Sequence, residues 1–125
     1  TRFLITDIVR AIKNKEVFKT SVDNIVRDFI TPPDFYNLIQ AIIDAKSTNI
    51  ALDCYTKNPV SKFDLLSELK NKFGLIYDFD ENIDTIDATG AKVNYYSTNK
   101  ISGNIKYMPD NTSLDGIIQE MNCVL

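Results

Sequence analysis

Histidine and tryptophan are absent from this 125-residue chain, which also holds only two cysteines and four glycines. Without histidine, the chain itself supplies no histidine general base, no serine–histidine triad and no histidine-ligated zinc site. Cys54 and Cys123 are too few for a cysteine-only zinc site or a disulfide framework. We therefore expect no metal site in these residues, and a reducing cytoplasm is the simpler location for two free thiols.

The chain also lacks glycine-rich loop motifs and clusters of basic residues, and both absences exclude further classes of function. The four glycines form neither a Gly-x-Gly-x-x-Gly fingerprint nor a P-loop, so we expect no dinucleotide or phosphate loop of those types in this chain. A net charge of -3 and the lack of a Lys/Arg run give no footprint for nucleic acid or an anionic membrane. No apolar stretch approaches the roughly 18 residues of a transmembrane helix.

What is present indicates one mixed domain. The length fits a single core, and 44% hydrophobic with 25% charged residues is ordinary for a globular protein. Apolar residues recur at helical spacing in four segments, and capping residues mark their starts. We expect these helices near residues 3–15, from Thr31-Pro32 onwards, from Ser61 to Gly74, and from Thr112 or Ser113 onwards.

Short apolar segments between these helices predict strands. Val17-Phe18 is typical of an edge strand, Ile50–Tyr55 alternates as a strand does, and Leu75–Phe79 is a third candidate. Residues 80–94 are expected to form a loop. Helices between strands favour parallel pairing. The predicted fold class is α/β, mixed α+β as an isolated fragment, with about four helices and a few short strands.

Two apparent motifs carry no chemistry. Tyr96 and Lys100 match the spacing of a dehydrogenase Tyr-x-x-x-Lys pair, but Ser, Thr and Asn between them are poor residues for a helix interior. The acidic run between Asp78 and Asp87 lacks the glycine and the glutamate that a calcium loop requires at its sixth and twelfth positions. We interpret the first as a loop or helix start with exposed polar groups and the second as a solvated acidic loop.

One segment carries a family resemblance. Residues 27–34, Arg-Asp-Phe-Ile-Thr-Pro-Pro-Asp, resemble the Arg-Asp-Phe/Tyr-Ile-x-x-x-Asp signature of extended short-chain dehydrogenases/reductases, the NAD-dependent epimerase/dehydratase family. Other segments match this family in the same order and spacing, namely residues 7–12, 17–18, 50–55, 59–61, 96–100, 107–109 and 112–116. The resemblance therefore covers nearly the whole chain.

The resemblance implies an incomplete enzyme. Residues 1–125 would be a single C-terminal substrate-binding domain fragment of a nucleotide-sugar epimerase or dehydratase. The parent protein would bind NAD or NADP through its own N-terminal Rossmann domain. Because the family's catalytic Tyr-x-x-x-Lys precedes the Arg-Asp-Phe segment, we expect no catalytic residue and no bound cofactor in this fragment. The expected partners are a nucleotide-sugar and the Rossmann domain, and a homodimer remains an open alternative.

The resemblance also implies a substrate site. Arg27 would bind the diphosphate, because a guanidinium presents a planar fork of donors to phosphate oxygens. Val17 and Phe18 would lie near the nucleotide base, with main-chain groups reading its edge. Phe29 would line the same pocket, and Asp34 would cap its own helix.

One departure from the family leaves alternatives open. The family often has a second arginine near the position of Asp87, whereas no arginine follows Arg27 in this chain. Lys92 could replace it only as a point charge without a bidentate fork. The alternatives are a non-catalytic binding or assembly module with the same fold, and a ketoreductase acting on a non-nucleotide substrate.

The predicted strand Ile50–Tyr55 has a further consequence. In the family, the matching strand belongs to the large parallel sheet of the cofactor domain, which this chain lacks. An exposed apolar edge invites pairing with another chain. We therefore expect the isolated fragment to self-associate or to rearrange this strand.

Overall fold

The computed structural model describes residues 3–46, 49–83 and 93–125. Within these ranges the chain forms four α-helices, five short strands and one 3-10 helix. In chain order they are α1 (Leu4–Asn14), β1 (Val17–Thr20), β2 (Val26–Arg27), α2 (Pro32–Asp44), β3 (Val60–Ser61), α3 (Lys62–Phe73), β4 (Ile76–Phe79), β5 (Asn94–Tyr95), η1 (Ile101–Ile105) and α4 (Ser113–Val124). The expected mixed fold with four helices is confirmed.

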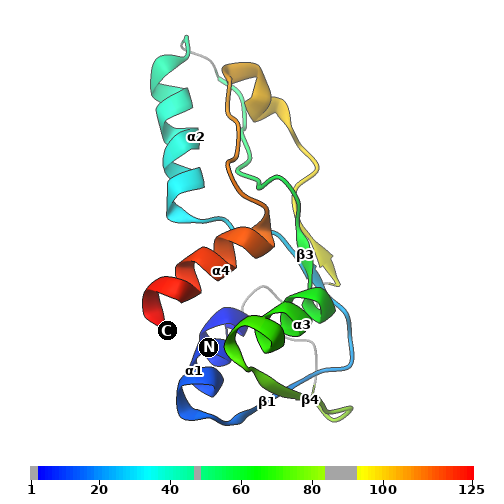
Figure 1. Ribbon diagram of the computed structural model, residues 1–125. Coiled ribbons are helices and arrows are strands. Elements are labelled where there is room, and N and C mark those ends of the chain that lie inside the picture. Colours follow the sequence, from blue (N-terminus) through cyan, green and yellow to red (C-terminus); the bar gives the residue numbers. More distant parts are fainter. Residues whose placement is uncertain (1–2, 47–48, 84–92) are drawn as a thin grey trace.

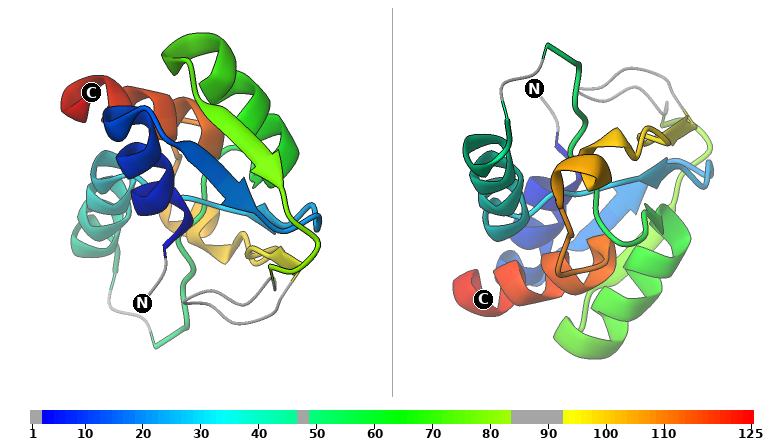
Figure 2. Two further views of the ribbon diagram at one scale, coloured as in Figure 1. Left: turned by 90° about the horizontal axis from the view of Figure 1, so that it is seen from below. Right: turned by 90° about the horizontal axis from the view of Figure 1, so that it is seen from above.

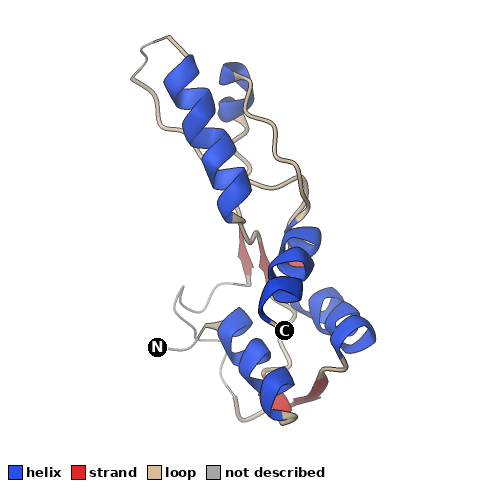
Figure 3. Ribbon diagram, turned by 60° about the vertical axis from the view of Figure 1, so that its left-hand side comes forward, coloured by secondary structure: helices blue, strands red, loops and turns tan. Residues whose placement is uncertain are grey.

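The elements fall into two groups (Figures 1 and 3). We call α1, β1, α3, β4 and α4 the body, and we call α2, the extended segment 51–56 and residues 96–110 around η1 the arm. The short strands β2, β3 and β5 lie where the arm joins the body (Figure 1). The predicted site residues belong to the body and to this junction.

The body contains the main core. Strand β1 pairs in parallel with β4, aligning Val17 with Ile76 and Thr20 with Phe79, and the two strands are flanked by α1 and α3 (Figure 2). The parallel pairing predicted for strands separated by helices is confirmed for β1 and β4, whereas β2 and β3, which are separated by α2, pair antiparallel. The residues buried together come from the three body helices, from β1 and β3, and from the position just before β4. They are Ile8, Ala11, Phe18, Val60, Leu65, Leu66, Leu69, Leu75, Ile117 and Met121.

Local capping signals explain where these helices begin and end. The side chains of Ser61 and Thr112 accept hydrogen bonds from the backbone N–H three residues later, as N-caps do. Helix α3 ends at Gly74, whose φ of 70° is the left-handed conformation that glycine adopts without strain. Lys15 ends α1 in the same conformation, with a φ of 56°, at a cost that glycine would avoid.

The arm has a much smaller core. Leu38, Tyr55 and Tyr107 form its buried cluster, in which the two tyrosine rings meet edge to face with centroids 5.1 Å apart. The sequence predicted one apolar face on α2, but the structure buries only Leu38 from that face. The remaining members of the predicted face are exposed, namely Phe35, Ile39, Ile42 and Ile43.

One predicted strand is absent, and one predicted loop is slightly shorter than expected. Residues 50–55 form no strand, and the N–H groups of Ala51 to Tyr55 donate no hydrogen bond to other described residues. The segment is instead fastened through side chains: Ser102 Oγ donates to Asp53 O at 2.7 Å, and Tyr107 Oη donates to Tyr55 O at 2.6 Å. The expected loop 80–94 ends early, because Asn94 already belongs to β5.

Candidate functional site

Arg27 lies in the middle strand of the three-stranded sheet β3–β2–β5. It aligns with Val60 on one side, in an antiparallel pair, and with Tyr95 on the other, in a parallel pair. Such pairing between distant segments places this side chain where residues 26–27, 60–61 and 93–95 converge. The pairing is non-local, so the sequence motif alone could not predict these neighbours.

The Arg27 side chain is buried rather than extended into solvent, with 6% of its surface exposed. Its Nη1 atom donates to Val26 O at 2.9 Å and to Val93 O at 3.1 Å. The guanidinium carbon also lies 5.7 Å from the centroid of the Tyr95 ring, a cation–π distance. These contacts fix the orientation of the guanidinium, and Tyr95 is a neighbour that sequence reasoning missed.

The residues after Arg27 fasten the junction. Asp28 accepts hydrogen bonds from both the backbone N–H and the hydroxyl of Thr56. The backbone N–H of Phe29 donates to Ser113 Oγ at 2.8 Å, at the start of α4. The ring of Phe29 packs against the body core. Strand β2 is thereby tied to the arm on one side and to the body on the other.

Asp34 is structural, but in a different way from the prediction. Thr31 caps α2 as expected, since its hydroxyl accepts from the Asp34 N–H at 3.4 Å. The carboxylate of Asp34 does not cap α2. It is fully buried and accepts from the N–H of Asp110 at 2.7 Å and of Asn111 at 3.4 Å. It thus joins the first turn of α2 to the segment that leads into α4.

The predicted base-binding residues lie on β1, in the other sheet. Val17 is half exposed, whereas Phe18 is buried in the body core. Phe18 and Phe29 therefore share one core, while Val17 and Arg27 belong to separate sheets. The predicted second cation, Lys92, and the corresponding position Asp87 lie outside the described residues.

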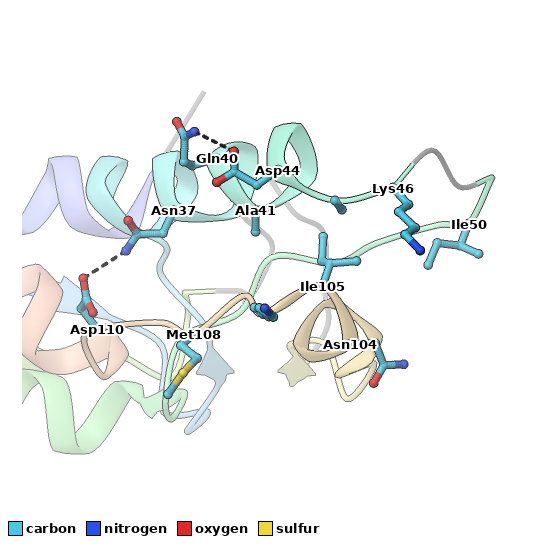
Figure 4. Close-up of a pocket in the computed structure, with 12 residues that line it drawn as sticks. Asn37, Gln40, Ala41, Asp44, Lys46, Ile50, Asn104, Ile105, Met108 and Asp110 are labelled. Atoms are coloured by element: carbon cyan, nitrogen blue, oxygen red, sulfur yellow. Dashed lines mark hydrogen bonds between the residues drawn. The ribbon is translucent and has the colours of Figure 1, made fainter.

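An open hollow of about 950 Å³ lies in the arm between α2 and the segment around η1 (Figure 4). Its carboxylates are engaged within its own wall: Asn37 Nδ2 donates to Asp110 Oδ2 at 3.0 Å, and Gln40 Nε2 donates to Asp44 Oδ1 at 3.5 Å. None of the predicted substrate residues lines this hollow. In the described ranges no cluster of three or more Cys, Asp or Glu side chains could hold a metal ion.

The apparent dehydrogenase motif has no helical geometry. Residues 96–100 form neither helix nor strand, which agrees with the loop among the two alternatives that the sequence left open. Tyr96 is exposed, and the Nζ atom of Lys100 lies 3.9 Å from the ring centroid of Tyr55 rather than beside Tyr96. Lys100 therefore contributes a cation–π contact to the arm.

Ionisable groups in the arm core are held in their neutral forms. Burial, and then the contact with Cys54, raise the pKa of Tyr107 far above its ordinary value. Burial also raises the pKa of the Cys54 thiol, whose Sγ lies 3.5 Å from Tyr107 Oη. A protonated thiol is a poor nucleophile, so the geometry favours a packing role for Cys54.

The described part of the chain contains no helix long and apolar enough to cross a membrane. No protein-family model matches the chain, and no curated protein matches its sequence.

Two solved structures resemble this chain in fold, and both are of UDP-glucuronic acid 4-epimerase from Bacillus cereus. The first, in complex with UDP-glucuronic acid and NAD, matches with a TM-score of 0.77 and 16% identity over 96% of this chain. The second is a tyrosine-to-phenylalanine variant in complex with UDP-4-deoxy-4-fluoro-glucuronic acid and NAD, and it matches with a TM-score of 0.76 and 16% identity. The chain spans only 38% of the length of either structure. At this identity the likeness concerns the fold.

Proposed function

We propose that this chain is the substrate-binding part of a larger NAD(P)-dependent enzyme that epimerises or dehydrates a nucleotide-activated sugar. The observation that carries the proposal is the fold match over 96% of the chain to an epimerase crystallised with a UDP-sugar and NAD. The Arg-Asp-Phe segment supports it, because this segment begins in β2 with Arg27 and leads towards α2.

Arg27 is the proposed ligand of the diphosphate. Backbone carbonyls orient its guanidinium, whose planar fork of donors matches phosphate oxygens, so a diphosphate is a chemically suitable partner. Contacts with Val26, Val93 and Tyr95 hold the side chain in place, which reduces the entropy that binding would otherwise cost. The half-exposed β1 residue Val17 and the main chain of Phe18 are proposed to lie along the base.

A separate cofactor domain is part of the proposal. Helix α2 exposes Phe35, Tyr36, Ile39, Ile42 and Ile43, next to the extended segment Ala51–Tyr55, whose N–H groups donate no hydrogen bond to other described residues. We propose that the parent's Rossmann domain covers this surface.

Nucleotide titration of the natural full-length protein tests the assignment. We expect Arg27→Ala to weaken UDP binding about 10- to 100-fold, because charge-assisted hydrogen bonds to phosphate are lost. The matched control is Arg10→Ala, which removes an exposed arginine of α1 that pairs with Asp7 in its own helix. Calorimetry should show unchanged affinity for this control.

Two outcomes would contradict the proposal at different levels. Equal UDP affinity of the Arg27→Ala variant and the unaltered protein would remove Arg27 from the site. A full-length protein that lacks a Gly-x-x-Gly-x-x-Gly strand–turn–helix and a Tyr-x-x-x-Lys helix before this chain would instead support the non-catalytic module.

A further inference from the structure

Lys62 is the first residue of α3, and its side chain is buried, with 3% of its surface exposed. The Nζ atom donates three hydrogen bonds to two residues: to Ser21 O at 2.7 Å, to Ser21 Oγ at 2.9 Å and to Thr20 Oγ1 at 3.2 Å. All three donors of the ammonium group therefore reach oxygen atoms of one short segment. Sequence reasoning treated this position only as the residue after a helix cap.

The location is an unfavourable one for a positive charge. Burial removes water from the ammonium group, and the N-terminus of a helix carries a positive partial charge. Burial accordingly lowers the pKa of Lys62, an effect that the nearby carboxylate of Asp23 opposes. An apolar residue would fill this position without that cost, so what distinguishes lysine here is its bonds to the Thr20-Ser21 segment.

Those bonds hold the connection between β1 and β2. Thr20 is the last residue of β1, and Ser21 begins the link to β2. Two backbone groups at the start of α3 hold the remainder of the link: Lys62 N–H donates to Ile25 O at 2.7 Å, and Phe63 N–H donates to Asn24 Oδ1 at 2.9 Å. The start of α3 thus fixes the path of the chain over residues 20–25.

Strands β1 and β2 carry the two halves of the proposed nucleotide site, Val17-Phe18 for the base and Arg27 for the diphosphate. They belong to different sheets, so no backbone ladder sets their separation. We propose that Lys62 is a positioning residue that sets the distance between the base-binding and diphosphate-binding segments. This inference rests on the proposed function and adds to it a residue that touches neither ligand group.

A positioning role has a specific signature, because it affects only ligands that span both segments. In the natural full-length protein, we expect Lys62→Met to weaken UDP binding about tenfold, as a displaced binding group does. Uridine and pyrophosphate each engage one segment, and their separate affinities should stay within about twofold of the unaltered protein. Lys62→Arg keeps the charge and the donors and should recover most of the UDP affinity.

The matched control is Lys70→Met, which removes an exposed lysine from the same helix. Ser21→Ala is the second variant, because it removes one acceptor while leaving Lys62 in place and so tests the same link if Lys62→Met folds poorly. In the Lys62→Met background, Ser21→Ala should cause no further loss of UDP affinity, since the bond is already absent.

The possible failures are distinguishable. If the unaltered protein binds UDP through Arg27 but Lys62→Met leaves UDP affinity unchanged, the positioning role is wrong and the proposed function stands. An equal loss for UDP, uridine and pyrophosphate would show that Lys62 serves only stability, which also overturns the inference. A protein that binds no UDP at all would overturn the proposed function and this inference with it.

Discussion

The body and the arm are built from similar sequence patterns but differ in how much of those patterns they bury. In the body, α1, α3 and α4 place their apolar faces into a common core that leaves Leu65, Leu66 and Leu69 fully inaccessible. In the arm, α2 has an equally clear apolar face, yet only Leu38 is buried from it. The comparison teaches that helical periodicity predicts a face to be covered and does not identify what covers it.

The largest expected contrast is between one side chain from each region. Leu66→Ala should destabilise the protein by about 2–5 kcal/mol, because it leaves a cavity in a core with no access to water. Ile43→Ala removes a side chain that is 68% exposed and should change stability by less than about 0.5 kcal/mol in the isolated monomer. Urea unfolding of both variants measures the difference. If Ile43→Ala caused a large loss of stability that depended on protein concentration, copies of the chain would cover the arm in solution.

The contact between the arm and the body gives the next largest effect. A Cβ atom on Gly116 of α4 would lie 2.5 Å from Thr31 Cγ2 at the start of α2, too close for either group. We therefore expect Gly116→Ala to cost about 1–3 kcal/mol through overpacking. Thr31→Ser deletes the clashing methyl group and keeps a hydroxyl N-cap, so the double variant should regain most of the loss. Thermal unfolding measures this, and failure of the double variant to recover would place the strain elsewhere.

The smallest contrast is the response of the two regions to alkaline pH. In the arm, the pKa of Tyr107 is raised above its ordinary 10.0, so its contribution to stability is complete below pH 10 and is lost as the pH rises further, by up to about 1.4 kcal/mol per pH unit. In the body, the pKa of Lys62 is lowered from 10.5, so its contribution increases with pH up to that value.

Urea unfolding between pH 8 and pH 11 tests this opposition when Tyr107→Phe and Lys62→Met are compared with the unaltered chain. Tyr107→Phe should lessen the alkaline loss of stability, although Cys54, whose pKa is also raised, keeps a share of it. Below pH 10.5, Lys62→Met should make the loss of stability steeper, because the contribution of Lys62 that increases with pH over this range disappears. Parallel pH profiles for all three proteins would contradict both assignments.

Local signals in the sequence predicted the elements well. Thr31, Ser61, Thr112 and Gly74 act within a few residues of themselves, so the starts of α2, α3 and α4 and the end of α3 followed directly from the sequence. The fold class followed as well, because amphipathic periodicity separated by short apolar segments has few compact arrangements.

The features that the sequence did not predict depend on pairing or packing partners that are distant in the sequence or absent from the chain. Residues 50–55 alternate as a strand does, but no described segment pairs with them. Strands β3 and β5 have only two residues each and exist through pairing with β2, which no local pattern encodes. At the site, the motif located Arg27, whereas its burial, its contact with Tyr95 and the burial of Lys62 arise from tertiary packing.

The carboxylate of Asp34 also imposes an order of events during synthesis. It is fully buried in the finished protein, and its 2.7 Å donor, the N–H of Asp110, lies 76 residues later in the chain. At the usual pace of translation these residues take about 4 to 15 seconds to appear. Throughout that interval the carboxylate of Asp34 lacks this donor, so the first turn of α2 cannot be joined to the segment that leads into α4 until Asp110 has been synthesised.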